Sequence, residues 1–351
     1  MRHLYVIFSL FVFFLCVQSK QHLLQPSKHL PQHQHFSVVG VLDVGVGPQY
    51  REYKRWLAVS PSSLLHATLS QHIPLVIRSL PRKTTQHVNT TREAINNAIE
   101  QTRQSKYTAQ SPVIPWTQRE IVVPDVTDLI TVRTLAQIAN NAYIEVPNTF
   151  DWIDVNKPWN LSSDFGWEKN GLRGHVYTNH NNETVIISLK GTSPDIFLGG
   201  GTGSNDKLND NLLFSCCCAK VGMTWRPVCD CCSSRQVCNS TCVESELASS
   251  AHYYQAALEI YYTIHDAFPE STIWITGHSL GGSIAALTGL TFAAPTVTFC
   301  APGDRLAAKR LHLPLPPGVK PEDQLVWHFG HTGDPIYMGT CTVHSIDTEL
   351  M

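Results

Sequence analysis

A serine lies between two glycines in the sequence GHSLG, residues 277–281, where two contrasting segments meet. Residues 272–276 are β-branched and aromatic and predict a buried strand, whereas residues 280–293 are small or aliphatic and predict a buried helix. A strand that turns sharply into a helix needs glycines where side chains would collide, and it leaves the serine Oγ exposed above the sheet edge. We therefore interpret Ser279 as the serine of a nucleophile elbow. An ordinary serine in a glycine-rich turn is the alternative.

The segments around this motif alternate between strands and helices, which predicts an α/β sheet. Apolar residues at helical spacing predict helices over 129–143 and 244–268. Two strands around an Asn-rich turn are predicted within 171–195. A further strand is predicted over 325–329, with polar residues after it, at the end of the strand where α/β sheets keep their ligands.

Ser279 needs two helpers, because a hydroxyl near neutral pH is a poor nucleophile. An imidazole must take its proton, and a carboxylate must orient that imidazole. In α/β hydrolases the acid lies between the serine and the histidine along the chain. Asp334 follows the predicted strand 325–329, and we predict that it is this acid. An aspartate that caps its own loop is the alternative.

The developing oxyanion needs two backbone N–H donors. Leu280, at the start of the predicted helix, supplies one of them. Thr192, in the sequence LKGT of residues 189–192, is the predicted second donor, with a simple strand-ending turn as the alternative. His278 is expected to support the elbow rather than to act as the base, because adjacent side chains on such a turn point apart.

Eight of the 11 cysteines crowd into residues 216–242. Closely spaced thiols could complete a tetrahedral zinc shell. Disulfides are the favoured interpretation, because the amino terminus predicts passage across a membrane into an oxidising compartment. The pairing cannot be derived from sequence. Neither a metal nor another cofactor is expected.

The amino terminus carries two basic residues and then an apolar run, residues 4–17. This run has the length of a signal-peptide core and is short for a membrane span. Residues 1–19 are therefore expected to be a signal peptide or a signal-anchor, and either one carries the remaining chain across a membrane. Residues 20–124 are expected to form a linker and a polar lumenal region.

Charge and glycosylation motifs bear on the partners and on the compartment. The net charge of −2 at pH 7 shows no basic excess, so no nucleic-acid partner is expected. In an acidic lumen, protonation of the 17 histidines would make the chain cationic and would favour anionic lipid surfaces. Four sequons predict glycosylation in the secretory pathway, at Asn89, Asn160, Asn182 and Asn239.

Several segments resemble the fungal autophagic-body lipases of the class 3 lipase superfamily. They are IWITGHSLGGSIAALTGLTF, APGDRLAAKRLHLP, HFGHTGDPIYMGTC and the cysteine block that begins LLFSCCCAK. The resemblance covers about residues 125–341, and the cysteine block is its most specific part. It implies an α/β-hydrolase fold with a Cys-rich insertion at 216–242 and an N-terminal membrane segment.

The resemblance also implies a function. The family hydrolyses esters of phospholipid or triacylglycerol, and its members are type II membrane proteins. They travel through multivesicular bodies to the vacuole, where they break down autophagic-body and internal-vesicle membranes. Carried over by position, Ser279 is the nucleophile, Asp334 the acid, and Thr192 with Leu280 the oxyanion donors.

The tail, residues 342–351, departs from the family. In the family the catalytic histidine lies beyond the segment that matches residues 328–341. His344 is only a weak candidate for the base, and His328 and His331 precede the acid, so no histidine is assigned. We expect the sequence either to be truncated at its C-terminus or to lack its general base.

Three functions stay open at this point. The leading one is a lumenal hydrolase of membrane phospholipid or neutral lipid, with anionic phosphoinositides as further candidate partners. The second is a catalytically inactive membrane-binding protein of the same fold, and the third is a soluble esterase or peptidase. Apolar residues 196–198 before a run of glycines would suit a lipid-facing lid. Acyl specificity and oligomeric state do not follow from the sequence.

Overall fold

The computed structural model describes most of the chain from Gln32 onwards. The described residues are 32–34, 36–44, 54–58, 77–108, 112–147, 149, 152–153, 155, 164–167, 170–179, 182–193, 202–215, 217, 226–232, 238–249, 252–334 and 336–338. The predicted membrane segment 1–19, the lid segment 196–198 and the tail 342–351 lie outside these residues. Among the residues described, no helix is long and apolar enough to cross a membrane.

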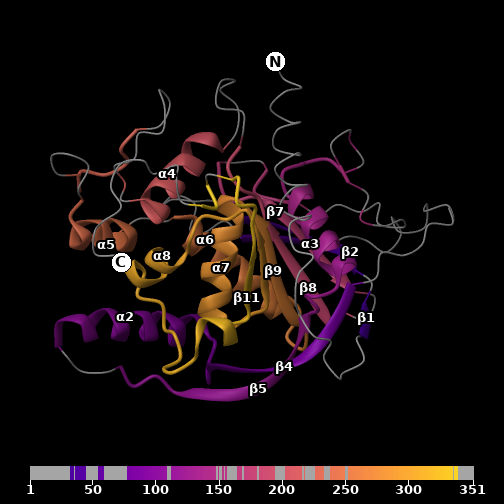
Figure 1. Ribbon diagram of the computed structural model, residues 1–351, viewed down its shortest axis with the longest axis horizontal. Coiled ribbons are helices and arrows are strands. Elements are labelled where there is room, and N and C mark those ends of the chain that lie inside the picture. The colour runs from indigo at the N-terminus through magenta and orange to yellow at the C-terminus, as the bar shows by residue number, and fades with distance from the viewer. Residues whose placement is uncertain are drawn as a thin grey trace, which may run out of the picture.

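A mixed sheet of eight strands forms the centre of the described structure, in the order β11-β10-β9-β8-β7-β2-β3, with β6 paired to β7 (Figure 1). The strands are β2 (Phe36–Val44), β3 (Lys54–Ala58), β6 (Asp164–Phe165), β7 (Gly174–Asn179), β8 (Thr184–Leu189), β9 (Thr272–His278), β10 (Thr296–Phe299) and β11 (Val326–Phe329). Strands β8 to β11 run parallel to one another, and β7 is antiparallel to β8. These parallel strands place the carboxyl ends of β8, β9, β10 and β11 along one edge.

Helices cover both faces of this sheet, as Figure 1 shows for α7 (Leu280–Phe292) and α3 (Leu129–Asn141). Side chains alternate along β9, because successive residues of a strand point to opposite faces. Ile273 and Ile275 join the core that contains α6 (Tyr253–Ala267) and α7, whereas Trp274 joins the core that contains α3. The α/β-hydrolase architecture predicted from the resemblance is confirmed.

Helix α3 begins at its predicted cap. The Asp128 side chain accepts a hydrogen bond from the Thr131 N–H, which satisfies one of the free donors of the first turn. The helix predicted over 244–268 was wrong in its extent, because the structure divides that stretch into α5 (Ser240–Ser249) and α6. His252 is extended between them, and the Tyr253 N–H donates to the Asn209 side chain at 2.8 Å.

A second sheet precedes the predicted domain boundary at residue 125. It has the order β1-β4-β5, formed by β1 (Gln32–Gln34), β4 (Ile77–His87) and β5 (Trp116–Pro124). Helix α2 (Arg92–Thr108) lies between β4 and β5 in the chain. This sheet packs on the main one, since Ile77 lies in the core around α3 and the Trp274 indole N–H donates to the Val122 carbonyl at 2.9 Å.

The remaining elements are short and lie at the ends of the sheet. They are α4 (Gly203–Phe214), α8 (Arg305–Arg310) and a 3-10 helix, η3 (Pro321–Asp323). Helix α4 follows the loop after β8 and lies near the carboxyl ends of the strands (Figure 1). It therefore borders the edge where the predicted site residues gather.

Candidate active site

Ser279 stands on a strained turn between β9 and α7. Its backbone lies at φ 54° and ψ −130°, in a region that residues other than glycine seldom adopt. The Ser279 N–H donates to the Phe299 carbonyl at 3.0 Å, and the Ser279 carbonyl accepts from the Ser283 N–H at 3.1 Å. The turn is thus tied to β10 on one side and to the first turn of α7 on the other.

The two glycines of the motif allow this turn to close. A Cβ added to Gly277 would lie 2.5 Å from the Gly281 carbonyl oxygen, and one added to Gly281 would lie 2.3 Å from the Leu189 carbonyl oxygen. Both distances are too short for any side chain. The strand, tight turn and helix predicted from the sequence are present, and the elbow rests directly on the end of β8.

The loop after β8 lies against the elbow. A Cβ added to Gly191 would lie 2.4 Å from the His278 carbonyl oxygen and 3.2 Å from the Ser279 Cβ. Thr192 is the next residue of this loop, and Leu280 follows Ser279 directly. The structure therefore places both predicted oxyanion donors near the elbow, Leu280 next to Ser279 in the chain and Thr192 next to the contact at Gly191.

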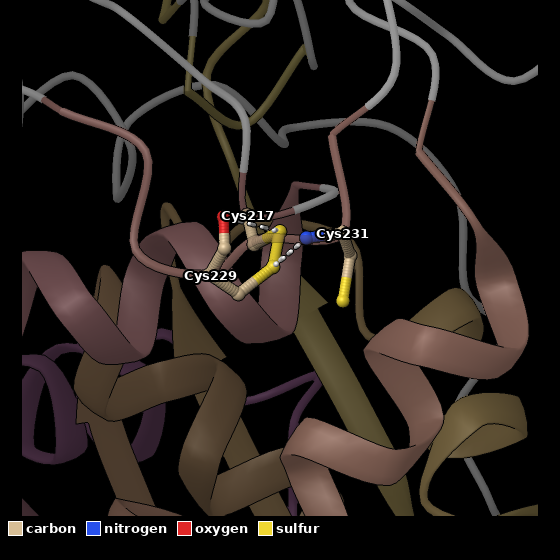
Figure 2. Close-up of side chains that lie close together, drawn as sticks. All are labelled: Cys217, Cys229 and Cys231. Atoms are coloured by element: carbon tan, nitrogen blue, oxygen red, sulfur yellow. Dashed lines mark hydrogen bonds between the residues drawn. A yellow bond between two sulfur atoms is a disulfide. The ribbon is translucent and has the colours of Figure 1, made fainter.

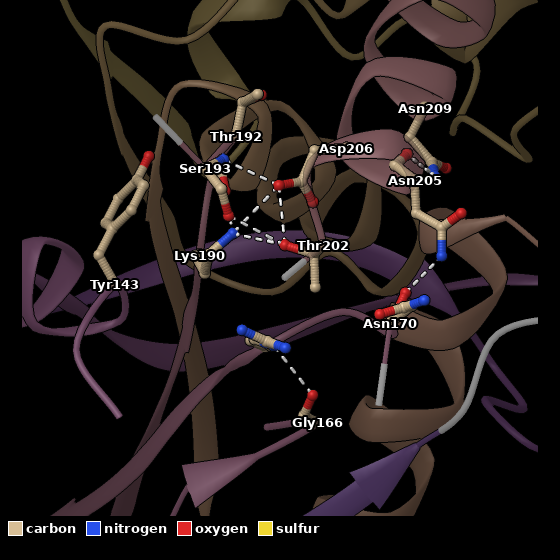
Figure 3. A network of polar contacts seen from close by, with 12 residues as sticks. Tyr143, Gly166, Asn170, Lys190, Thr192, Ser193, Thr202, Asn205, Asp206 and Asn209 are labelled. Carbon is tan, nitrogen blue, oxygen red and sulfur yellow. Dashed lines mark hydrogen bonds and ion pairs between the residues drawn. The ribbon is translucent and has the colours of Figure 1, made fainter. Parts of the chain in front are cut away.

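Thr192 is braced by helix α4. Its hydroxyl donates to Asp210 Oδ2 at 2.5 Å, and the neighbouring Ser193 N–H donates to Asp206 Oδ2 at 2.8 Å. Burial raises the pKa of Asp210 to about 7. Two aspartates one helical turn apart thus hold consecutive residues of the loop, and Figure 3 shows Asp206 facing Ser193, Lys190 and Thr202.

A buried ion pair lies beneath the loop. Lys190 and Asp206 expose 5% and 2% of their side chains, and Nζ lies 3.2 Å from Oδ2 (Figure 3). Nζ also donates to the Gly191 carbonyl at 2.8 Å. Asp206 accepts further hydrogen bonds from the hydroxyls of Thr202 and Tyr253, each at 2.8 Å. Because every group has a partner, the pair can persist away from water.

His278 is held away from the role of a base. Its Nδ1 lies 2.8 Å from the Tyr143 hydroxyl, and burial lowers its pKa to about 4. A neutral imidazole that is hydrogen-bonded to a buried tyrosine supports the elbow from behind. This geometry agrees with the expectation from the sequence.

Asp334 lies beyond β11, at the same edge of the sheet as Ser279. Strands β9, β10 and β11 end in register, with His278 opposite Phe299 and Phe299 opposite Phe329. Asp334 is 5% exposed, and burial raises its pKa. Its Oδ1 accepts the Ile336 N–H at 2.9 Å, so it also caps its own loop as the alternative predicted.

His328 and His331, the two described histidines near Asp334 in the sequence, have partners other than Ser279. His328 Nδ1 lies 2.8 Å from the Thr298 hydroxyl, and its Nε2 lies 3.7 Å from Asp304. His331 Nδ1 accepts the Gly333 N–H at 2.9 Å. No histidine in the described part of the chain hydrogen-bonds Ser279. His344 lies outside the described residues.

The cysteine-rich insertion is stapled by disulfides, as favoured from the sequence. Cys217 pairs with Cys229 (Figure 2), and Cys231 pairs with Cys242. The sulfurs of Cys217, Cys229 and Cys231 lie within 4.8 Å of one another, which is the spacing that a zinc site would also need. Their oxidation to disulfides removes the thiolates that a metal would bind. The Cys217 N–H donates to the Asn211 carbonyl at 2.9 Å, which ties the insertion to α4.

The sequon asparagines within the described residues are accessible. Asn89, Asn182 and Asn239 are all exposed. Asn182 lies at the turn between β7 and β8, at a φ of 57°. Asn160 lies outside the described residues. Glycosylation at these four positions stays a prediction.

Residues 224–299, which include the elbow, match the class 3 lipase family. The chain is 51% identical over 246 residues to a protein of Vanderwaltozyma polyspora named "Putative lipase ATG15". It is 47% identical over 241 residues to the protein of that name from Saccharomyces cerevisiae. This chain is similar to fungal proteins that are named as lipases.

The matches cover different shares of the two chains. They take in 68% and 67% of this chain but 44% and 46% of the relatives, so the chain spans about half the length of the curated relatives that it matches. Among solved structures, the Lip2 lipase of Yarrowia lipolytica is similar at 18% identity and a TM-score of 0.35, over 62% of this chain and 75% of that one.

Three residues that support this candidate site were missed by sequence reasoning. Lys190, Asp206 and Asp210 support the loop beside Ser279, but only Lys190 lies in a motif that the sequence analysis singled out. The sequence contained one signal for the two aspartates, because residues four apart in the helix 203–214 lie on the same face. Which loop that face contacts became visible only in the folded chain.

Proposed function

We propose that this chain is a serine-dependent lipid ester hydrolase. The observation that carries the proposal is the strained elbow, with Ser279 between β9 and α7 and the Gly191–Thr192 loop against it. A buried, braced loop next to a strained serine is the arrangement that acyl transfer requires. The similarity to proteins named as lipases supports the same reaction.

In the proposed mechanism, Ser279 Oγ attacks the ester carbonyl and gives up its proton to a histidine. The N–H groups of Leu280 and Thr192 receive the negative charge that develops on the carbonyl oxygen. Asp334 orients the histidine and stabilises its positive charge. The alcohol leaves with the proton, and water then releases the fatty acid from the serine by the reverse sequence of proton transfers. The histidine is not assigned to a residue.

The proposed substrates are membrane phospholipid or neutral lipid, with anionic phosphoinositides as further candidates. The proposed place of action is the vacuole lumen, where the membranes of autophagic bodies and multivesicular-body vesicles would be hydrolysed. The chain would arrive there as a single-pass type II membrane protein by way of the multivesicular body. The family resemblance and the name of the relatives support these proposals.

A second function, lipid binding without catalysis, rests on one observation. No histidine in the described part of the chain hydrogen-bonds the Ser279 side chain. Without a general base, a serine hydrolase typically loses several powers of ten in rate. The same fold would then bind lipid without cleaving it.

Release of fatty acid from phospholipid vesicles at acidic pH tests both functions. The full chain and its Ser279→Ala variant would be measured side by side, after both are shown to be folded and oxidised. Activity that is abolished in the variant supports the hydrolase and requires a histidine of this chain as the base. Vesicle binding without fatty-acid release in either protein would refute the hydrolase and favour the second function.

A further inference from the structure

A cavity of about 250 Å³ lies between α2, α5, α6 and α8. It is separate from the proposed active site, because neither the elbow nor the loop after β8 contributes to its walls. Figure 1 shows α2, α5 and α8 gathered on one flank of the sheet. Its walls combine aliphatic side chains with charged ones, a mixture typical of small-molecule sites.

Arg310 is the unusual group in this cavity. It is the last residue of α8 and lines the wall, yet only 3% of it is exposed. Its Nη1 donates to the Ser215 carbonyl at 2.5 Å, and its buried Nε has no hydrogen-bond partner. Among the described residues no carboxylate forms an ion pair with it. A guanidinium has five N–H donors, and burying it without a counter-charge is costly.

The acidic groups of the cavity are already neutralised by other partners. Glu100 pairs with Arg103 on α2. Glu244 on α5 lies 2.7 Å from Lys106 Nζ. His312 Nε2 lies 3.4 Å from Glu244 but adds no positive charge at pH 7, because burial lowers the pKa of its imidazole. The two glutamates therefore leave the charge of Arg310 uncompensated. A bound anion would supply the missing counter-charge.

We propose that this cavity binds a phosphate group through Arg310, with Arg103 and His312 as further donors. A guanidinium binds phosphate through two parallel hydrogen bonds, and additional donors can reach the remaining oxygens. The apolar wall, which includes Ile99, Leu247 and Leu311, suits the carbon skeleton of a phosphate ester. The ligand is therefore inorganic phosphate or the phosphomonoester headgroup of a lipid such as phosphatidic acid. This inference does not depend on the proposed hydrolase.

Phosphate binding would also join two parts of the chain. Arg103 lies on α2, before the predicted domain boundary, whereas Arg310 and His312 lie behind the cysteine-rich insertion in the sequence. A ligand held by all three would hold α2 against α5 and α8. A ligand that binds only the folded chain raises its melting temperature by mass action.

Calorimetric titration of the full chain with inorganic phosphate, at constant ionic strength, tests the proposal. Phosphatidylcholine vesicles with and without phosphatidic acid form a second arm. Arg310→Gln is compared with Arg305→Gln, because Arg305 lies on the same helix and is exposed. We expect Arg310→Gln to weaken phosphate binding at least ten-fold and to abolish the rise in melting temperature. Arg305→Gln should leave both unchanged.

Arg103→Gln provides a second variant if Arg310→Gln does not fold, since the Arg103 side chain is 42% exposed. It should weaken phosphate binding several-fold with an unchanged melting temperature in phosphate-free buffer. If inorganic phosphate binds, free phosphate is sufficient to fill the cavity. If only the vesicles with phosphatidic acid bind, the ligand is the lipid headgroup. Equal binding by the native chain and the arginine variants, or no binding of either probe, would overturn the proposal.

Discussion

Removing the charge of Asp206 should destabilise the chain strongly, because it removes the counter-charge that is hydrogen-bonded to the buried Lys190. Lys190 is 5% exposed, and its other hydrogen-bond acceptors are the neutral oxygens of Gly191 and Thr202. Breaking a buried pair at one partner costs about 3–5 kcal/mol. Asp206→Asn keeps the shape of the side chain, so we expect the free energy of unfolding to fall by about this amount.

A double-mutant cycle separates the ion pair from the other contacts. Lys190→Met alone should also be costly, but the double variant Lys190→Met/Asp206→Asn should lose clearly less than the sum of the two single variants. We expect a coupling free energy of at least about 2 kcal/mol. Urea unfolding of the oxidised protein, followed by tryptophan fluorescence, measures all four corners of the cycle.

The exposed pair Arg92–Glu259 is the matched control. Its atoms lie 2.7 Å apart, closer than those of the buried pair, but the side chains are 48% and 28% exposed. Solvent screening limits such a pair to about 1 kcal/mol or less, so its own cycle should give little coupling. The claim that burial makes the Lys190–Asp206 pair strong would be refuted if both cycles gave the same coupling free energy. It would also be refuted if the unfolding free energies lost in the two single variants simply added in the double variant.

Two further predictions concern α4 and its surroundings. The pKa of Asp210 is raised from 3.8 to about 7, so folding favours its protonated form. The contribution of this group to the free energy of unfolding should therefore be complete below about pH 4 and be lost as the pH rises to about 7. Because Asp210 keeps part of its surface in solvent, we expect this pH-dependent loss of stability to be about 2 kcal/mol and to be absent in Asp210→Asn. Parallel profiles of unfolding free energy against pH in the two proteins would contradict the raised pKa of Asp210. Replacing Cys231 and Cys242 by serine opens a disulfide of sequence separation 11 and should lower the free energy of unfolding by about 2–4 kcal/mol. An unchanged urea midpoint, with the native disulfide shown intact by mass spectrometry, would argue against that role.

The elbow could be predicted because its causes are local. The two glycines, the β-branched run before Ser279 and the small residues after it all lie within 22 residues, 272–293. The same holds for the cap at Asp128, which bonds to a residue three positions away. Features of this kind depend on short-range sterics and hydrogen bonds, which the sequence displays directly.

The support around the elbow could not be predicted, because it depends on contacts between distant residues. Asp206 meets Tyr253 across 47 residues, and Tyr143 meets His278 across 135. The break between α5 and α6 also involves a distant partner, because the Tyr253 N–H at the start of α6 donates to the side chain of Asn209. Nothing near these residues in the sequence identifies their partners.

The hydrogen bond from the Trp274 indole to the Val122 carbonyl has a practical consequence for the limits of the folding unit. Trp274 lies in β9, the strand that leads into Ser279, and Ile77 packs into the same core with 1% of its surface exposed. A recombinant fragment that started at residue 125 would uncover this core and remove the acceptor behind the strand. A stable recombinant fragment therefore has to start before β4, so that the residues packed behind the strand of Ser279 are kept.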